Sequence, residues 1–180
     1  MKTLYELLES YILVYLPLER GCSKNTVVSY YSTIKQFLAY VKDAYPKSKE
    51  ISLLDFNHDN VSAFLMKVES DGRSITTRNQ KLAALASFVT YCAMMEPLYQ
   101  NTLDSIKKIR LKKAVRNKLD FLTVDEYKAF ISAIDLSEKN GLRYYTMINF
   151  LYDTATRVSE FTHIKVEDLN YGSENSVRVL

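Results

Sequence analysis

The sequence predicts a mainly α-helical protein whose last third mixes helices with short strands. Apolar residues recur at the helical spacing of about 3.6 residues through most of the chain. Only 4 Gly and 3 Pro occur among 180 residues, which disfavours a turn-rich all-β fold. Residues 1–118 carry 18 Lys and Arg against 11 Asp and Glu, whereas residues 119–180 carry 6 against 10. This charge asymmetry predicts two units with different roles.

Four amphipathic helices are expected in the first unit, followed by a short fifth. Thr3 and Glu6 form a capping-box pattern that begins the first helix, and Pro17 and Gly21 end that helix or follow its end. The later helices are expected at about Thr26–Val41, Asn60–Glu69, Thr76–Met95 and Leu103–Ile109. The apolar stripes of the third and fourth helices predict these core residues: Val61, Phe64, Leu65, Val68, Leu82, Leu85, Phe88, Val89 and Cys92.

A strongly basic segment, Lys107–Lys118, follows the fifth helix. Seven of its twelve residues are Lys or Arg and none is acidic. It has no sustained apolar face, so we expect a linker here, between one unit at residues 1–106 and another at 119–180. Such a run of cations can follow a DNA backbone and release counterions. The alternative is a solvated charge run that contacts nothing.

The second unit begins with another capping-box pattern, Thr123-x-x-Glu126. An apolar helix is expected at Leu142–Tyr152 and a short helix around Arg157–Ile164. The final residues, Val177–Leu180, favour a β-strand. Because an unpaired strand edge is unstable by itself, we expect the chain to be a fragment of a longer protein.

The most specific motif is Thr154-Ala155-Thr156-Arg157-Val158-Ser159-Glu160-Phe161, with Ile164 and Asp168 after it. Here the sequence resembles the tyrosine recombinase (phage integrase) family. Its members carry a Thr-Gly-x-Arg-(Ile/Val)-Ser-Glu-Leu box, then a Leu three residues on and an Asp four beyond that. Ala155 stands where members usually have Gly. If that position needs a positive φ, the change costs about 1 kcal/mol.

The resemblance implies that the complete protein breaks and rejoins DNA at specific sites through a 3′-phosphotyrosine intermediate, with no metal or nucleotide cofactor. Arg157 is the expected catalytic residue, because a guanidinium offers planar, bidentate donors that stay charged at any relevant pH. Glu160, one helical turn on, is placed to orient it. The alternative is an ordinary surface Arg–Glu pair. The family's hairpin Lys, His-x-x-Arg pair, further His or Trp, and nucleophilic Tyr are not expected in this chain, so we predict that it binds DNA without cleaving it.

The resemblance also implies a SAM-like core-binding domain of four to five helices at residues 1–106. A truncated start of a mixed α+β catalytic domain is expected from residue 119. The segments Ser23–Thr26 and Ser74–Asn79 open helices that lie against the major groove in the family. Free N–H groups and short polar side chains at such positions suit phosphates, although plain N-capping explains them too. The candidate DNA contacts are Asn25, Thr26, Tyr30, Thr76, Thr77, Arg78, Lys81, Lys107, Lys108, Arg110, Lys112, Lys113, Arg116 and Lys118.

The partners and the location of the protein are predicted from the resemblance and from further sequence features. The resemblance implies a homo-tetramer on two double-stranded DNA sites, whereas the fragment alone can be a monomer. Glu6 and Glu9 interrupt any signal peptide, and no apolar run approaches the roughly 18 residues of a membrane span. Cys22 and Cys92 form no CxxC pair, which disfavours a disulfide framework or zinc site and fits a reduced, cytoplasmic protein.

No catalytic role is expected for the remaining candidate residues. His58 and His163 match no catalytic position of the family, and neither Tyr152 nor Tyr171 is expected to be the nucleophile. Two other functions stay open. One is a non-catalytic helical DNA-binding regulator or accessory factor, in which Arg157 is incidental. The other is a helical protein-interaction module, which would not retard duplex DNA.

Overall fold

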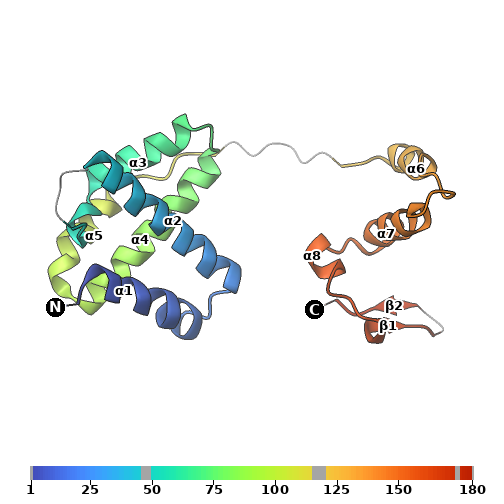
Figure 1. The fold of residues 1–180 in the computed structure, drawn as a ribbon, viewed down its shortest axis with the longest axis horizontal. Helices are drawn as coiled ribbons and strands as arrows, with labels where there is room; N and C mark the ends of the chain where they lie inside the picture. The colour runs from blue at the N-terminus through green and yellow to red at the C-terminus, as the bar shows by residue number, and fades with distance from the viewer. Residues whose placement is uncertain (1, 46–49, 115–120, 173–174, 180) are drawn as a thin grey trace. The chain divides into compact units, whose positions relative to one another are not determined.

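The computed structural model describes residues 2–45, 50–114, 121–172 and 175–179. The chain divides into two compact units, Met1–Arg116 and Asn117–Leu180, which we treat separately. Helices dominate both units, so the prediction of a mainly α fold is confirmed (Figure 1). No helix in the described ranges is long and apolar enough to cross a lipid bilayer. The functional division into residues 1–106, 107–118 and 119–180 stays a prediction.

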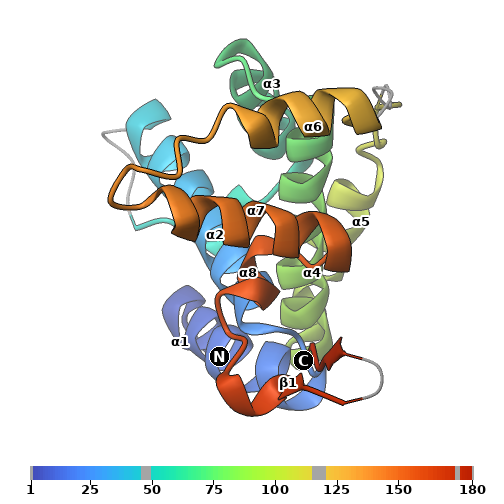
Figure 2. The same ribbon diagram turned by 90° about the vertical axis from the view of Figure 1, so that its right-hand side faces the viewer.

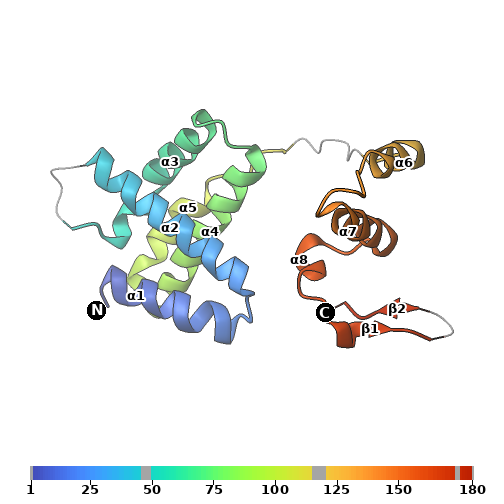
Figure 3. The same cartoon turned by 45° about the vertical axis from the view of Figure 1, so that its right-hand side comes forward.

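Unit 1 is a helical bundle arranged around one long helix. Its elements are α1 (Leu4–Ser10), η1 (Tyr11–Glu19), α2 (Lys24–Ala44), η2 (Leu53–Asp55), α3 (His58–Ser70), α4 (Ile75–Met95), η3 (Pro97–Tyr99) and α5 (Gln100–Lys107). Helix α4 packs against α2, α3 and α5, whereas α1 continues directly into η1 (Figure 3). The four predicted amphipathic helices and the short fifth are all present.

The start of the first helix is confirmed, but only one of the two signals predicted for its end, Gly21, follows the continuous helical segment. The Glu6 N–H donates to Thr3 Oγ1 at 3.2 Å, and the Thr3 N–H donates to Glu6 Oε2 at 2.7 Å. Pro17 does not end the helix, because it lies inside η1, a helix with wide, π-type turns. The wider turn relieves the clash that a proline ring makes with the preceding turn of an α-helix. Gly21, with φ of 59°, follows the helix end as predicted.

The core of unit 1 contains every residue that the stripes of α3 and α4 predicted. Aromatic side chains of η1 and α4, which are far apart in the sequence, meet in it. Tyr11 contacts Phe88 and Tyr91 with ring centroids 5.2 and 5.4 Å apart. Burial raises the pKa of Tyr11, whose hydroxyl donates to Ser87 Oγ at 2.8 Å. The buried hydroxyl therefore keeps a partner, as a tyrosine in a core requires.

In its described residues, unit 2 contains three helices, a short helical turn and a small hairpin. Its elements are α6 (Val124–Ser132), α7 (Gly141–Thr154), α8 (Val158–Phe161), η4 (Val166–Asp168), β1 (Leu169–Asn170) and β2 (Ser176–Val177). The strands are antiparallel, with Leu169 opposite Val177. Helices α6 and α7 lie side by side (Figure 2), and the Tyr127 ring stacks on Tyr152 at 3.6 Å between centroids.

Unit 2 buries far less apolar surface than unit 1. Among its described residues only Gly141 is fully buried. Large apolar side chains remain open to solvent, including Phe121 at 81% and Val166 at 83% exposure.

Candidate nucleic-acid interface and catalytic arginine

A tight turn between α7 and α8 carries the arginine that the sequence singled out. Helix α7 ends at Thr154, whose hydroxyl donates to the Phe150 carbonyl at 2.7 Å. Ala155 then adopts a left-handed conformation with φ of 51°, and no other described non-glycine residue has a positive φ. The position therefore needs the conformation that the family's glycine adopts without strain. Alanine is strained there by about 1 kcal/mol.

Arg157 lies at the N-cap of α8 and is held by Glu160. The Arg157 N–H donates to Glu160 Oε2 at 2.8 Å, and its Nη1 donates to Glu160 Oε1 at 2.5 Å. One carboxylate thus fixes both the backbone and the guanidinium of the same residue. These two hydrogen bonds, the backbone one first, hold the pKa of Glu160 below its ordinary value. The Arg157 side chain is still 82% exposed, so donors remain for an incoming anion.

The two histidines are occupied by local contacts. His163 Nδ1 lies 2.6 Å from the Ser159 carbonyl oxygen, within the turn that follows Arg157. His58 Nδ1 lies 3.0 Å from Asp59 Oδ1, and the His58 backbone N–H donates to Ser105 Oγ at 2.9 Å and so ties α3 to α5. Cys22 and Cys92 are free thiols.

The N-terminal ends of α2 and α4 share one capping geometry. Ser23 Oγ accepts from the Thr26 N–H at 3.3 Å, and Ser74 Oγ accepts from the Thr77 N–H at 3.1 Å. In both pairs the two hydroxyl oxygens are 3.0 Å apart. The serines and threonines therefore act first as caps. Exposed polar residues beside the caps, such as Thr76, remain available to a ligand.

A groove between α2 and α4 brings several candidate DNA contacts together. It has a volume of about 330 Å³ and is lined by Asn25, Thr26, Ser29, Tyr30, Gln80 and Ala83. Three of these residues were predicted, whereas Ser29 and Gln80 were missed. Ser29 follows Thr26 by three residues, so helical spacing alone could have revealed it. Hydroxyl and amide groups of this kind are common donors to DNA phosphates.

Two predicted contacts, Arg78 and Lys81, are engaged inside unit 1. Arg78 is 5% exposed, and its Nη1 donates to the Arg110 carbonyl oxygen at 3.0 Å. Lys81 Nζ donates to Gln36 Oε1 at 2.7 Å and so joins α4 to α2. Desolvation and, second, the nearby Arg73 lower the pKa of Lys81. The sequence predicted solvent-facing cations at both sites. It could not reveal these partners, because they lie far away along the chain.

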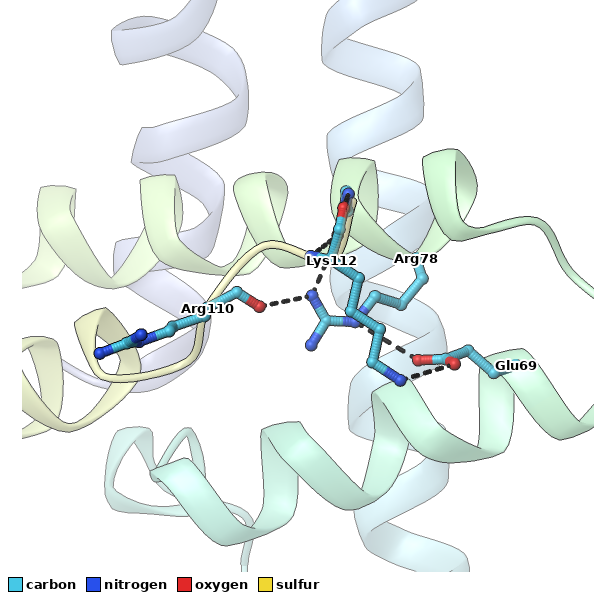
Figure 4. A network of polar contacts seen from close by, with 5 residues as sticks. Glu69, Arg78, Arg110 and Lys112 are labelled. Atoms are coloured by element: carbon cyan, nitrogen blue, oxygen red, sulfur yellow. Dashed lines mark hydrogen bonds and ion pairs between the residues drawn. The ribbon is translucent and has the colours of Figure 1, made fainter. Parts of the chain in front are cut away.

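The predicted basic linker divides into parts with different surroundings. Five of its cations are exposed: Lys107, Lys108, Arg110, Lys112 and Lys113. Among these, the Lys112 ammonium pairs with Glu69 Oε2 at 2.8 Å. The Lys112 backbone also pairs with Asn79, so this part of the segment is docked on unit 1 (Figure 4). Arg116 and Lys118 lie outside the described residues.

Comparisons with known proteins match both units. The family model for the N-terminal SAM-like domain of phage integrases matches residues 8–94, and that for the phage integrase family matches residues 120–179. A putative integrase/recombinase, y4rC of Sinorhizobium fredii, is 31% identical over 180 residues, covering 99% of this chain and 54% of that protein. The tyrosine recombinase XerC of Staphylococcus carnosus is 28% identical, covering 96% of this chain and 55% of that protein.

A solved structure supports the fold. The XerH site-specific recombinase, bound to its palindromic difH substrate in a post-cleavage complex, matches with a TM-score of 0.63 and 22% identity. The match covers 89% of this chain and 47% of that one. The chain spans about half the length of the curated relatives it matches.

Proposed function

Because the chain belongs to the tyrosine recombinase (phage integrase) family, we propose that the complete protein breaks and rejoins DNA at specific sites through a 3′-phosphotyrosine intermediate. The geometry around Arg157 carries this proposal. Its guanidinium is exposed at the start of α8, yet it is oriented by Glu160, within the segment that matches the phage integrase family. The family match of this segment, together with the contact to Glu160, separates Arg157 from an incidental surface arginine.

Arg157 is proposed to clamp the scissile phosphate. Negative charge builds up on the non-bridging oxygens when a tyrosine attacks, and a charged, planar donor stabilises that charge. Glu160 is the positioning residue, because its contact to Nη1 limits the directions in which the guanidinium can point. A preorganised donor of this type contributes about 10²–10³-fold to the rate of a reaction.

DNA binding is proposed to involve the α2–α4 groove of unit 1 and the exposed cations after α5. The groove offers neutral hydrogen-bond donors, and the five exposed cations of the basic segment offer charge. XerH, which shares the fold, was solved in complex with its DNA substrate, and this supports double-stranded DNA as the partner. The proposed assembly on two DNA sites is a homo-tetramer, as the family resemblance implies.

The 180-residue chain alone is proposed to bind DNA without cutting it. It supplies Arg157, whereas the family's nucleophilic tyrosine and its other catalytic residues are expected in sequence that this chain does not contain. The chain's coverage of only about half of its curated relatives supports this division.

Duplex DNA tests these proposals directly. Binding by the chain is expected to weaken with salt, with a log–log slope of about −5 for roughly six phosphate contacts. The complete protein should form a covalent adduct with the 3′ phosphate of a nicked target site, and the chain should form none. An adduct formed by the chain would refute its inactivity. A complete protein that binds but never forms an adduct would favour a DNA-binding regulator, and no binding at all would favour a protein-interaction module.

A further inference from the structure

Two neighbouring residues of α4 hold the backbone of the basic segment that follows α5. Arg78 Nη1 donates to the Arg110 carbonyl oxygen at 3.0 Å. Asn79 Oδ1 accepts from the Lys112 N–H at 3.1 Å, and Asn79 Nδ2 donates to the Lys112 carbonyl oxygen at 2.7 Å (Figure 4). The asparagine side chain thus pairs with one residue's backbone as a neighbouring β-strand would. We call Arg78 and Asn79 the α4 clamp.

Glu69 of α3 supplies the charge that makes a buried arginine tolerable. The Arg78 side chain is 7% exposed, and a guanidinium buried to that extent is destabilising without a counter-charge. Glu69 Oε1 lies 3.5 Å from Arg78 Nε, which is an ion pair but not an aligned hydrogen bond. Glu69 Oε2 lies 2.8 Å from Lys112 Nζ. One carboxylate therefore links α3, α4 and the basic segment.

The clamp holds backbone atoms and leaves basic side chains available. In Figure 4 the Arg110 side chain points away from Arg78, although its carbonyl oxygen faces the Arg78 guanidinium. Arg110 and Lys113 are both exposed. The cations on either side of Lys112 are thus presented from a backbone whose path is fixed.

We propose that Arg78 and Asn79 are positioning residues that fix the direction and register in which the basic segment leaves unit 1. By doing so they hold Arg110 and Lys113 against the DNA backbone, and Arg78 is not itself a phosphate ligand. This inference rests on the proposed DNA-binding function. Its physical basis is preorganisation, because a segment ordered before binding loses less conformational entropy when it meets DNA.

The informative variant is Asn79→Ala, because it removes two of the three clamp hydrogen bonds and no charge. We expect the Lys112 amide to exchange about tenfold faster with solvent. We also expect duplex binding to weaken about fivefold and the log–log salt slope to become shallower by about 1. A neutral residue that only touched DNA could not change the slope in this way. Asn101 is an exposed asparagine on α5, and Asn101→Ala is the matched control. It should change neither the Lys112 amide exchange, nor the affinity for duplex DNA, nor the salt slope.

Further variants keep the test decisive. Arg78→Lys keeps the charge but loses the guanidinium fork, so it should behave like Asn79→Ala if Arg78 positions the segment. Arg78→Lys should match the wild type if only the positive charge of residue 78 matters for DNA binding. In an Arg110→Ala background, Asn79→Ala should have a smaller effect on the slope than in the wild type. Unfolding midpoints confirm that each variant is folded.

Two results overturn the inference and are distinguishable from each other. If the wild type binds DNA and Asn79→Ala exposes the Lys112 amide without changing affinity or slope, the clamp does not position DNA contacts. If the wild type shows no salt-dependent binding, the proposed function itself fails. In that case Lys112 protection in the wild type still shows whether the clamp exists.

Discussion

Ala155 departs from the family motif, which has Gly here, and still adopts a left-handed backbone conformation. Its φ of 51° is the conformation that glycine tolerates best, and its N–H donates to the Leu151 carbonyl at 3.0 Å. The sequence alone could state this only as a condition, because a backbone angle is not visible in residue types. The turn is nevertheless formed, since Thr154 and Thr156 contact each other across it with oxygens 3.0 Å apart.

Ala155→Gly is expected to stabilise the end of α7 by about 1 kcal/mol, because it removes the left-handed strain. The residue 155 amide should then exchange about fivefold more slowly.

Gly72→Ala is the reverse control. Gly72 has φ of 79°, and no atom lies within 4 Å of the place that an added methyl group would take, so this variant tests backbone strain without a clash. That change should destabilise unit 1 by about 1 kcal/mol. Unchanged exchange and stability would show that these backbone angles are unstrained.

Glu160 provides a prediction about pH. Its pKa is held below the ordinary value of 4.5 by the Arg157 N–H first and the guanidinium second. A lowered carboxyl pKa means that the stabilisation is present above pH 4.5 and is lost as the pH falls through the folded-state pKa. In Arg157→Ala the pKa of Glu160 should rise but stay below 4.5, because the backbone donor remains. Carboxyl NMR titration measures this, and a pKa unaffected by Arg157→Ala would contradict the side-chain contact.

Helices were predictable from the sequence where periodicity and caps agree. The stripes of α3 and α4 became the core, and both predicted capping boxes formed. The sequence did not reveal contacts between residues that lie far apart along the chain. The role of Arg78 depends on Arg110, 32 residues away, and on Glu69 of another helix. The wide turns of η1 allow Pro17 inside a helix, which local rules exclude.

Helix α4 can be tested by removing a ring from its core face. Phe88 is fully buried and contacts the rings of Tyr11 and Phe56. Phe88→Ala should lower the free energy of unfolding of unit 1 by about 3–5 kcal/mol, as a buried ring leaves a cavity. Met94→Ala on the same helix is the control, because Met94 is 60% exposed and should change stability by less than about 0.5 kcal/mol. Denaturant titration of both variants decides whether α4 is the centre of the core.

The two units differ in the extent of the buried core within each of them. Unit 1 has a continuous aromatic and aliphatic core, whereas only Gly141 is fully buried in the described part of unit 2. The sequence predicted two units from charge, but not this difference, because apolar residues are frequent in both.

Native-state hydrogen exchange should therefore separate the units. Amides in α3 and α4 are expected to be the slowest, since they open only when the core of unit 1 unfolds. Amides of α6 and α7 should exchange through local opening at a much lower free-energy cost. Equal protection in α4 and α7 would show that unit 2 has stabilising contacts of comparable extent.

The family assignment is central to the account, and Arg157 tests it most directly. Arg157→Ala in the complete protein should slow formation of the covalent DNA adduct by about 10²–10³-fold while leaving duplex binding largely intact. The two quantities are measured side by side on one target site. That separation is predicted if Arg157 acts on the scissile phosphate. Equal losses of adduct formation and binding would contradict it and favour a protein that only binds DNA.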